Sequence, residues 1–290
     1  MKVLEVCRWA EKEFSELESP RLEAELLLCH LMNWKRHELY LNHSNEIIDS
    51  SLKQYREIVL RRKNREPLQH ITGRVDFLGR SFIAGRGALI ARPETESLTE
   101  CFIKELSSPS YILDVGTGSG VIAVSLALEF PAAVVIGTDI SRKALTISQR
   151  NSELFGPDNL SFIRTDLLKT FGRDSRIFDG VIANLPYIPS SQISDLEPEV
   201  RNGDPLIALD GGTDGLELIS RLIDTVPGIL TKGGILALEL DREQVEPISD
   251  ILRKDPIWMS VKTLHDLTGR MRIIIARKGS DATCGTYKTC

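Results

Sequence analysis

The sequence has little of what marks several large classes of protein. It holds no apolar run of membrane-spanning length, and its start, Met1-Lys2-Val3-Leu4-Glu5-Val6, shows no signal-peptide pattern, so we expect no membrane association and a cytoplasmic location. Its 5 cysteines are odd in number, scattered and without metal-ligand spacing, which predicts free thiols and no metal site. The net charge of −5 gives no general attraction to nucleic acid, so we expect protein partners and no direct DNA binding.

The first part of the chain, residues 1–74, has the pattern of a small helical domain. Ser19 followed by Pro20 is typical of a helix start. Four apolar residues then fall on one helical face: Ala24, Leu27, Leu28 and Leu31. Another amphipathic helix is expected over Leu52–Lys63. It ends in a basic run, Arg61-Arg62-Lys63, which suits a solvated helix terminus, with a patch for an acidic partner as the alternative.

The rest of the chain alternates between strand and helix patterns. Val75 to Ile83, broken at Gly79, predicts a β-hairpin inside a linker of residues 75–90. Apolar strand-like runs follow at Tyr111–Val115, Val134–Gly137, Leu160–Ile163, Gly180–Ala183 and Ile235–Leu240. Such runs between helices indicate a parallel sheet covered on both faces. The pair Ile257–Val261 and Arg272–Ala276 is joined too closely for a crossover helix and predicts an antiparallel hairpin.

A sheet with this layout resembles that of the Rossmann-like class I methyltransferases. The predicted fold is therefore α/β, with a small N-terminal helical domain, a β-hairpin linker and a methyltransferase domain over residues 91–277. Residues 278–290 are expected to form a disordered tail.

A glycine loop, Asp114-Val115-Gly116-Thr117-Gly118-Ser119-Gly120, follows the first of these strands. A dinucleotide fingerprint needs G-x-G-x-x-G, but Val121 stands where its third glycine would fall. Asp114 would also repel a pyrophosphate, whereas it attracts the cationic amino group and sulfonium of S-adenosylmethionine. The loop therefore predicts S-adenosylmethionine as the cofactor.

Two more aspartates stand at the ends of the next strands. Asp139 comes 19 residues after Gly120, where a carboxylate can accept both ribose hydroxyls, and Ile140 beside it joins the predicted donor site. Asp166 is placed to hold the adenine amino group, with Leu167 beside the ring. Each aspartate alone could be a helix N-cap. Acidic residues at the ends of three successive strands, beside a glycine loop, favour a binding site.

The tetrapeptide Asn184-Leu185-Pro186-Tyr187 follows the Gly180–Ala183 run, at the sheet edge where ligands bind. An amide nitrogen is a poor nucleophile, so a site for it must orient it. We expect Asn184 Oδ1 to accept one N–H of the acceptor and the Leu185 carbonyl to accept the other. Pro186 would fix the turn, and Tyr187 would lie on the flat face of the amide. The alternative is an Asn-x-Pro turn with no chemical role.

With these motifs the chain resembles the release factor glutamine methyltransferases from about residue 20 to residue 277. The matching segments are Leu68–Gly73, Ala91–Glu96, Asp114–Gly120, Asn184–Pro189 and Asp210–Leu216. The resemblance implies methylation of the glutamine side-chain nitrogen, N5, in the Gly-Gly-Gln loop of class-one peptide chain release factors. It also implies that residues 1–74 bind the release factor. A substrate-binding role for Arg92, Pro93, Glu94 and Thr95 is likewise implied by the resemblance.

Two residues depart from the family pattern. Leu185 stands where the family has proline; it keeps the backbone carbonyl, so we expect activity to survive. Asp241 stands where glycine is more common, and we expect a slightly altered loop. Two rival functions remain: an adenine-N6 nucleic-acid methyltransferase, which would need a basic cleft, and a catalytically weak S-adenosylmethionine-binding regulator, against which the intact Asn184, Pro186 and Tyr187 argue.

Overall fold

The computed structural model describes residues 1–172 and 174–279, and these fall into two compact units. The first unit comprises Met1–Arg74 together with Glu197–Gly203, and the second comprises Val75–Leu196 and the chain from Asp204 onward. Within the described ranges, no helix combines the length and the apolar character needed to cross a membrane.

The first unit is all helical. Its helices are α1 (Val3–Glu13), α2 (Pro20–Met32), α3 (Arg36–Leu41), α4 (Asp49–Lys63), α5 (Leu68–Thr72) and α9 (Pro198–Gly203). The predicted start of α2 is confirmed, with Ser19 at the N-cap position and Pro20 in the first turn. The helix predicted from Leu52 begins earlier, at Asp49. Tyr55 of α4 is buried and donates a hydrogen bond of 2.8 Å to the Ala24 carbonyl of α2, which joins the two helices.

The basic end of α4 is not simply solvated. Arg62 is only 3% exposed, and its guanidinium donates to Glu23 at 2.7 Å and to Glu199 of α9 at 3.0 Å. The prediction of a solvated helix end is therefore wrong for Arg62. A buried guanidinium needs carboxylate partners, and these come from segments that are distant in the sequence.

The second unit opens with the predicted hairpin, which is confirmed. Strands β1 (Arg74–Phe77) and β2 (Arg80–Ile83) are joined by Leu78 and Gly79, whose φ angles are 47° and 71°. Two consecutive residues with positive φ match the twist of the flanking strands. Helix α6 (Pro93–Glu105) follows and carries Phe102 into the core of the unit.

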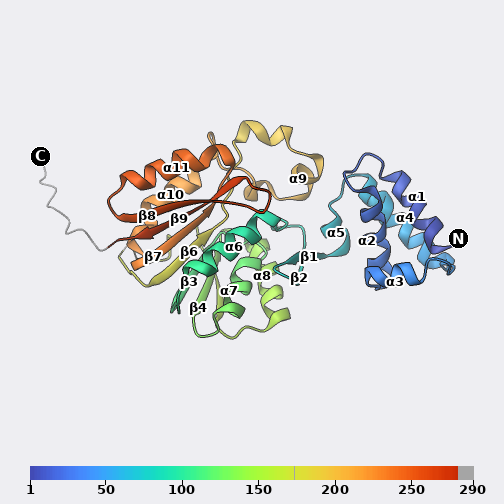
Figure 1. Cartoon of the computed structure of the whole chain (residues 1–290), viewed down its shortest axis with the longest axis horizontal. Helices are drawn as coiled ribbons and strands as arrows, with labels where there is room; N and C mark the ends of the chain where they lie inside the picture. The colour runs from blue at the N-terminus through green and yellow to red at the C-terminus, as the bar shows by residue number, and fades with distance from the viewer. Residues whose placement is uncertain (173, 280–290) are drawn as a thin grey trace, which may run out of the picture. The chain divides into compact units, whose positions relative to one another are not determined.

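The central sheet has seven strands in the order β5-β4-β3-β6-β7-β9-β8 (Figure 1). They are β3 (Tyr111–Val115), β4 (Val134–Asp139), β5 (Leu160–Arg164), β6 (Phe178–Ala183), β7 (Leu230–Glu239), β8 (Trp258–His265) and β9 (Met271–Lys278). β9 runs antiparallel to both β7 and β8, and the other pairs are parallel, as predicted. Lys278 belongs to β9 rather than to a tail, and the predicted disordered tail lies outside the described residues from residue 280.

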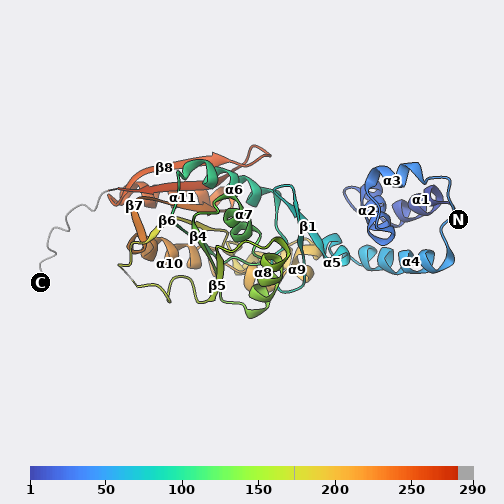
Figure 2. The same cartoon turned by 90° about the horizontal axis from the view of Figure 1, so that it is seen from below.

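Helices cover both faces of this sheet (Figures 1 and 2). The remaining helices are α7 (Val121–Glu129), α8 (Arg142–Phe155), α10 (Glu217–Thr225) and α11 (Arg242–Lys254), with short 3-10 turns η1 (Ser190–Asp195), η2 (Leu206–Ala208) and η3 (Val226–Gly228). Ile112 of β3 packs in the core with α6 and α7, while its neighbour Leu113 packs with α10 and α11. Strand order reverses between β3 and β6, so their carboxyl ends flank the crevice where such sheets bind ligands.

Cysteines and potential metal ligands show no special grouping within residues 1–172 and 174–279. Cys7, Cys29 and Cys101 are free thiols, and Cys284 and Cys290 lie outside the described residues. In the part of the chain that the structure describes, no group of His, Cys, Asp and Glu side chains could hold a metal ion.

Asp241 does more than alter a loop, because it caps α11. Its Oδ1 accepts the Glu243 N–H at 3.1 Å, and the Gln244 side chain accepts the Asp241 N–H at 3.2 Å. Replacing such a cap by alanine costs about 1 kcal/mol, and replacing it by glycine costs only a few tenths.

We therefore expect Asp241→Ala to lower the free energy of unfolding by about 1 kcal/mol, and Asp241→Gly, which restores the family residue, to lower it by much less. Urea unfolding of the two variants measures the difference. An unchanged free energy of unfolding in Asp241→Ala would show that the cap contributes nothing.

Candidate active site

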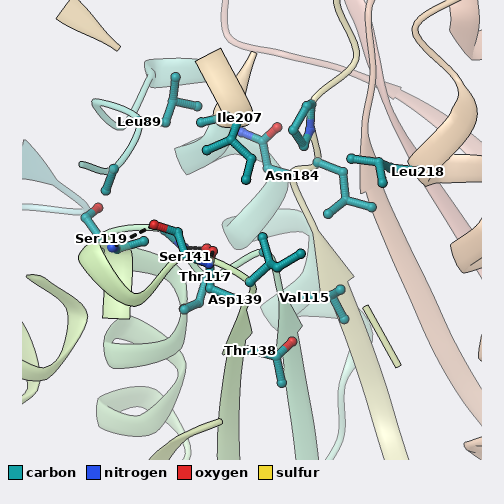
Figure 3. Close-up of a pocket in the computed structure, with 18 of the residues that line it drawn as sticks. Leu89, Val115, Thr117, Ser119, Thr138, Asp139, Ser141, Asn184, Ile207 and Leu218 are labelled. Carbon is teal, nitrogen blue, oxygen red and sulfur yellow. Dashed lines mark hydrogen bonds between the residues drawn. The ribbon is translucent and has the colours of Figure 1, made fainter. Parts of the chain in front are cut away.

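A cavity of about 250 Å³ lies at the carboxyl ends of β3, β4 and β6. Its lining brings together most residues singled out from the sequence: Thr95, Gly116, Thr117, Gly118, Ser119, Asp139, Ile140, Asp166, Leu167, Asn184, Leu185 and Pro186. The others contribute no lining: Arg92, Pro93, Glu94, Asp114, Gly120 and Tyr187. Figure 3 shows Asp139, Thr117 and Ser119 on one side of the cavity and Asn184 on another.

Some residues that line the cavity were not predicted from the sequence. They include Gly87, Ala88, Leu89 and Ala91 before α6, Thr138 and Ser141 around the end of β4, Pro205, Ile207 and Ala208 around η2, and Leu218 and Arg221 of α10. Most of these residues are small or apolar and follow no motif. The sequence does show an apolar pair here, Leu206 and Ile207; in the structure both are more than half exposed, and Ile207 lines the cavity.

The glycine loop folds over the end of β4. The backbone N–H groups of Gly116 and Thr117 both donate to the Thr138 carbonyl, each at 2.8 Å. Gly116 has a φ of 76°, and a Cβ on it would lie 2.9 Å from Leu185 Cδ2. The positive φ favours glycine here, and any other side chain would also have to displace the end of the Leu185 side chain.

Asp114 lies beneath this loop rather than in the cavity wall. It is 0% exposed; its Oδ2 accepts the Thr117 hydroxyl at 2.6 Å, and its Oδ1 has no hydrogen-bond partner among the described residues. Burial raises the pKa of the Asp114 carboxyl to about 7, although the hydrogen bond from Thr117 opposes the shift. A cation bound at the loop would favour its ionised form.

Asp139 ends β4 and faces the cavity (Figure 3). Its Oδ1 accepts the Ser141 N–H at 2.7 Å and its Oδ2 accepts the Gly118 N–H at 2.9 Å. Burial raises the pKa of this carboxyl, and these backbone bonds counteract the effect. Each oxygen accepts one such bond and has a further lone pair, so the carboxylate can still accept hydroxyl groups of a ligand.

Asp166 lies two residues beyond β5, which ends at Arg164, so the expectation that it ends the strand is wrong. Its carboxylate accepts two bonds from Arg221 of α10, at 2.8 and 2.9 Å, and pairs with Lys169 at 2.6 Å. Lys169 and Arg221 together lower the pKa of Asp166. The site therefore has an arginine at its edge that no sequence motif indicated.

The tetrapeptide is held by segments from elsewhere in the unit. Asn184 Nδ2 donates to the Thr95 hydroxyl at 3.0 Å, and Gln244 Nε2 donates to the Tyr187 carbonyl at 2.8 Å. The Gly211 N–H donates to the Ile188 carbonyl at 2.9 Å, which ties in the Asp210–Leu216 segment. Burial raises the pKa of Tyr187. The turn geometry thus depends on several tertiary contacts.

The segment Arg92–Thr95, for which the resemblance implies a substrate-binding role, lies at the start of α6. Arg92 pairs with the buried Asp204 at 2.7 Å, and Asp204 also accepts the Ile90 N–H at 3.0 Å. Pro93 opens α6, and within this four-residue segment only Thr95 lines the cavity. These contacts tie the chain before α6 to the start of the Asp204–Ala208 segment, whose Ile207 lines the cavity.

Comparison with known proteins agrees with this architecture. The PrmC N-terminal domain matches residues 5–73, and a methyltransferase domain matches residues 106–256. Among solved structures, a ribosomal protein L11 methylase from Lactobacillus delbrueckii subsp. bulgaricus superposes with a TM-score of 0.50 at 22% identity, covering 66% of this chain and 81% of that one. The hMettl16 catalytic domain superposes with a TM-score of 0.55 at 15% identity, covering 80% and 82%. Both share the fold, which confirms the predicted class I methyltransferase architecture.

Sequence relatives are much closer. The release factor glutamine methyltransferase of Koribacter versatilis is 36% identical over 269 residues, 92% of this chain and 94% of the relative. That of Geobacter sulfurreducens is 35% identical over 279 residues, 96% and 97% of the two chains. The predicted resemblance is confirmed: the chain is a methyltransferase and belongs to the release factor glutamine methyltransferase family.

Proposed function

We propose that this protein transfers a methyl group from S-adenosylmethionine to the side-chain amide nitrogen, N5, of the glutamine in the Gly-Gly-Gln loop of class-one peptide chain release factors. The observation that carries the proposal is the single cavity that the glycine loop and the tetrapeptide line together. Family membership supports the same substrate. We further propose that the helical residues 1–74 bind the release factor, and that the reaction takes place in the cytoplasm.

The cavity has groups that suit the proposed donor. When bound, S-adenosylmethionine would supply a methyl group to the amide nitrogen: the new C–N bond forms as the C–S bond breaks, S-adenosylhomocysteine leaves with the electron pair, and the nitrogen loses one proton to solvent. Asp139 would accept the ribose hydroxyls with the lone pairs that its backbone bonds leave free. Asp166 and Leu167 would contact the adenine, and the buried charge of Asp114 would favour the cationic end of the donor.

The acceptor amide would be oriented by Asn184 and Leu185. Asn184 donates its Nδ2 to Thr95, so its Oδ1 is available to accept an N–H from the substrate. The Leu185 carbonyl would accept the other N–H, which turns the nitrogen lone pair towards the methyl group. Positive charge developing on the nitrogen is then stabilised by two acceptors that are already in place.

The nucleic-acid alternative has less support. An adenine-N6 methyltransferase binds its polymer mainly through basic surface, and the net charge of this chain is −5. The likeness to the hMettl16 catalytic domain, at 15% identity, concerns the fold alone. Methylation of adenine is therefore treated as an outcome that the substrate experiment can reveal.

The donor site can be tested at Asp139. Asp139→Ala removes the acceptor of two ribose hydroxyls, so we expect S-adenosylmethionine binding to weaken by ~2 kcal/mol. Isothermal titration calorimetry measures it, with Asp158→Ala, at an exposed position outside the cavity, as the matched control. An unchanged dissociation constant in the folded Asp139→Ala protein would remove Asp139 from the donor site.

The next prediction concerns the departure from the family tetrapeptide. If only the Leu185 carbonyl acts on the substrate, Leu185→Pro should keep turnover within about tenfold, or ~1.4 kcal/mol in the barrier. Steady-state methylation of release factor measures it. Complete loss of activity would mean that the leucine side chain, which is 5% exposed and lies against Gly116, is required for the turn.

The substrate prediction concerns Asn184. Asn184→Ala should lower the methylation rate by about 10²–10³, the usual cost of one lost hydrogen bond to the transition state in a preorganised site. Binding of the release factor, measured separately, should change little, because we assign most of the docking surface to the helical residues.

The assay is mass spectrometry of release factor incubated with the protein and labelled donor. Replacing the loop glutamine of the release factor by alanine should abolish labelling. If the wild-type protein labels adenine in duplex DNA and leaves the release factor unmodified, the proposed substrate is wrong, although the site for a planar nitrogen would stand.

A further inference from the structure

Glu239, the last residue of β7, is a buried carboxylate that lies beside the tetrapeptide. Leu238 pairs with Ala183 of β6, so Glu239 and Asn184 leave neighbouring strands at the same level. Glu239 is 2% exposed, and its Oε2 has no hydrogen-bond partner among the described residues. Burying a carboxyl with an unpaired oxygen lowers the stability of the fold, which suggests that Glu239 has a functional role.

The neighbours of Glu239 indicate what that role is. The side chains of Thr95 and Asn184 both favour the ionised form of this carboxyl and lower its pKa, against the larger effect of burial. Asn184 also donates Nδ2 to the Thr95 hydroxyl at 3.0 Å. An asparagine side chain has two N–H donors on one atom and a single acceptor oxygen on the other. One N–H of Asn184 goes to Thr95, and a carboxylate beside the amide can take only the other N–H, so Oδ1 is the part of the Asn184 amide that remains for a ligand.

The direction of the Asn184 amide is otherwise not fixed by shape. The oxygen and nitrogen ends of an asparagine are nearly the same size, so their hydrogen-bond partners decide which end faces where. A carboxylate can only accept hydrogen bonds. A negatively charged Glu239 therefore admits one orientation of Asn184, with Nδ2 towards itself and Oδ1 away from itself.

We propose that Glu239 is a positioning residue for methyl transfer: with the Thr95 hydroxyl, it holds the Asn184 amide so that Oδ1 faces the acceptor nitrogen. This inference rests on the proposed role of Asn184 in binding the acceptor. Glu239 itself lies outside the cavity lining, so it acts through Asn184 and not on the substrate.

The proposed orientation of Asn184 depends on the charge of Glu239 and therefore on pH. Burial raises the pKa of the carboxyl to about 7, and the negative charge of Glu94 of α6 also raises it. The side chains of Thr95, Arg272 of β9 and Asn184 lower the pKa and so oppose this shift. Glu239 in turn helps to raise the pKa of Tyr187, on which Asp241 also acts. A protonated Glu239 can donate a hydrogen bond and no longer enforces the Asn184 orientation. Turnover is therefore lost as pH falls through about 7.

The central test is Glu239→Gln, which keeps the shape and replaces one acceptor oxygen by an N–H donor. The new side chain can donate to Asn184 Oδ1 and so present Nδ2 to the acceptor. We expect kcat at saturating donor to fall about 100-fold, with the S-adenosylmethionine dissociation constant within about twofold of wild type. Glu105→Gln, at the far end of α6, is the matched control, and its kcat should stay within about twofold.

A double variant distinguishes loss of the Asn184 orientation from a general disruption of the site. Asn184→Asp alone brings two carboxylates together and should be poorly active. Combining Asn184→Asp with Glu239→Gln restores one donor–acceptor pair and again leaves an oxygen for the acceptor N–H. The double variant should therefore be at least about tenfold more active than Asn184→Asp alone, which is ~1.4 kcal/mol in the barrier. Wild-type kcat in Glu239→Gln, or no recovery in the double variant, would overturn the proposal.

The pH profile of kcat adds a readout that structural damage does not reproduce. The wild-type protein should lose turnover below pH about 7, and Glu239→Gln should lack this limb. The buried carboxyl of Asp114, whose pKa is also raised to about 7, is unchanged in the variant. Because Asp114 is proposed to act on donor binding, the profile is measured at saturating donor, and a limb of unchanged size in Glu239→Gln under these conditions contradicts the assignment.

One measurement is independent of any substrate. In the ligand-free protein, the side-chain NH₂ of Asn184 should exchange slowly with solvent by ¹⁵N-resolved NMR, and this protection should be lost in Glu239→Gln. Loss of protection supports the positioning role even if the release factor proves not to be the acceptor. Unchanged Asn184 signals in Glu239→Gln would refute it.

Discussion

The parallel pairing of β3 with β6 is the constraint on which the site depends. Val115 stands opposite Ala183, so the glycine loop and the tetrapeptide begin side by side at the same sheet edge. The absence of a side chain on Gly116 then lets Leu185 approach closely. A shift of one residue in this register would turn every side chain of a strand to the other face. On the two buried faces of β3, Ile112 and Leu113 pack against different helices, so such a shift would exchange these packing contacts and change the distance between the two halves of the site.

Two buried carboxylates near the site, Asp114 and Glu239, have the same unusual character. Each has one oxygen without a hydrogen-bond partner within the described part of the chain, and burial raises the pKa of each to about 7. Groups of this kind lower stability and are typical of functional sites. Their positions suggest complementary tasks. Asp114 lies beneath the loop proposed to bind a cationic donor, and Glu239 lies behind the amide proposed to bind the acceptor.

Features of the fold that depend on residues close together in the sequence could be predicted, whereas contacts between residues far apart in the sequence could not. The β1–β2 hairpin follows from its pattern around Gly79, and the strands follow from continuous apolar runs, so both were predictable. The ion pairs were not, because Arg92 and Asp204 are 112 positions apart, and Arg221 and Asp166 are 55 apart. No local pattern records such a pairing. The same applies to Ile207, which becomes part of the cavity wall only when the chain after α9 returns to the second unit.

The tetrapeptide has leucine at position 185, where the family has proline, and the turn is held by contacts from other elements. Leucine at position 185 lacks the ring that would restrict its φ angle, yet the residues after it are fixed from outside. Gln244 of α11 holds the Tyr187 carbonyl, and Ile188 exchanges backbone hydrogen bonds with Leu209 and Gly211. The Asp241 cap fixes the first turn of α11, and this places Gln244 within hydrogen-bond distance of the Tyr187 carbonyl. The rigidity that proline would provide within the turn is thus supplied by neighbouring elements, which makes the substitution compatible with an intact site.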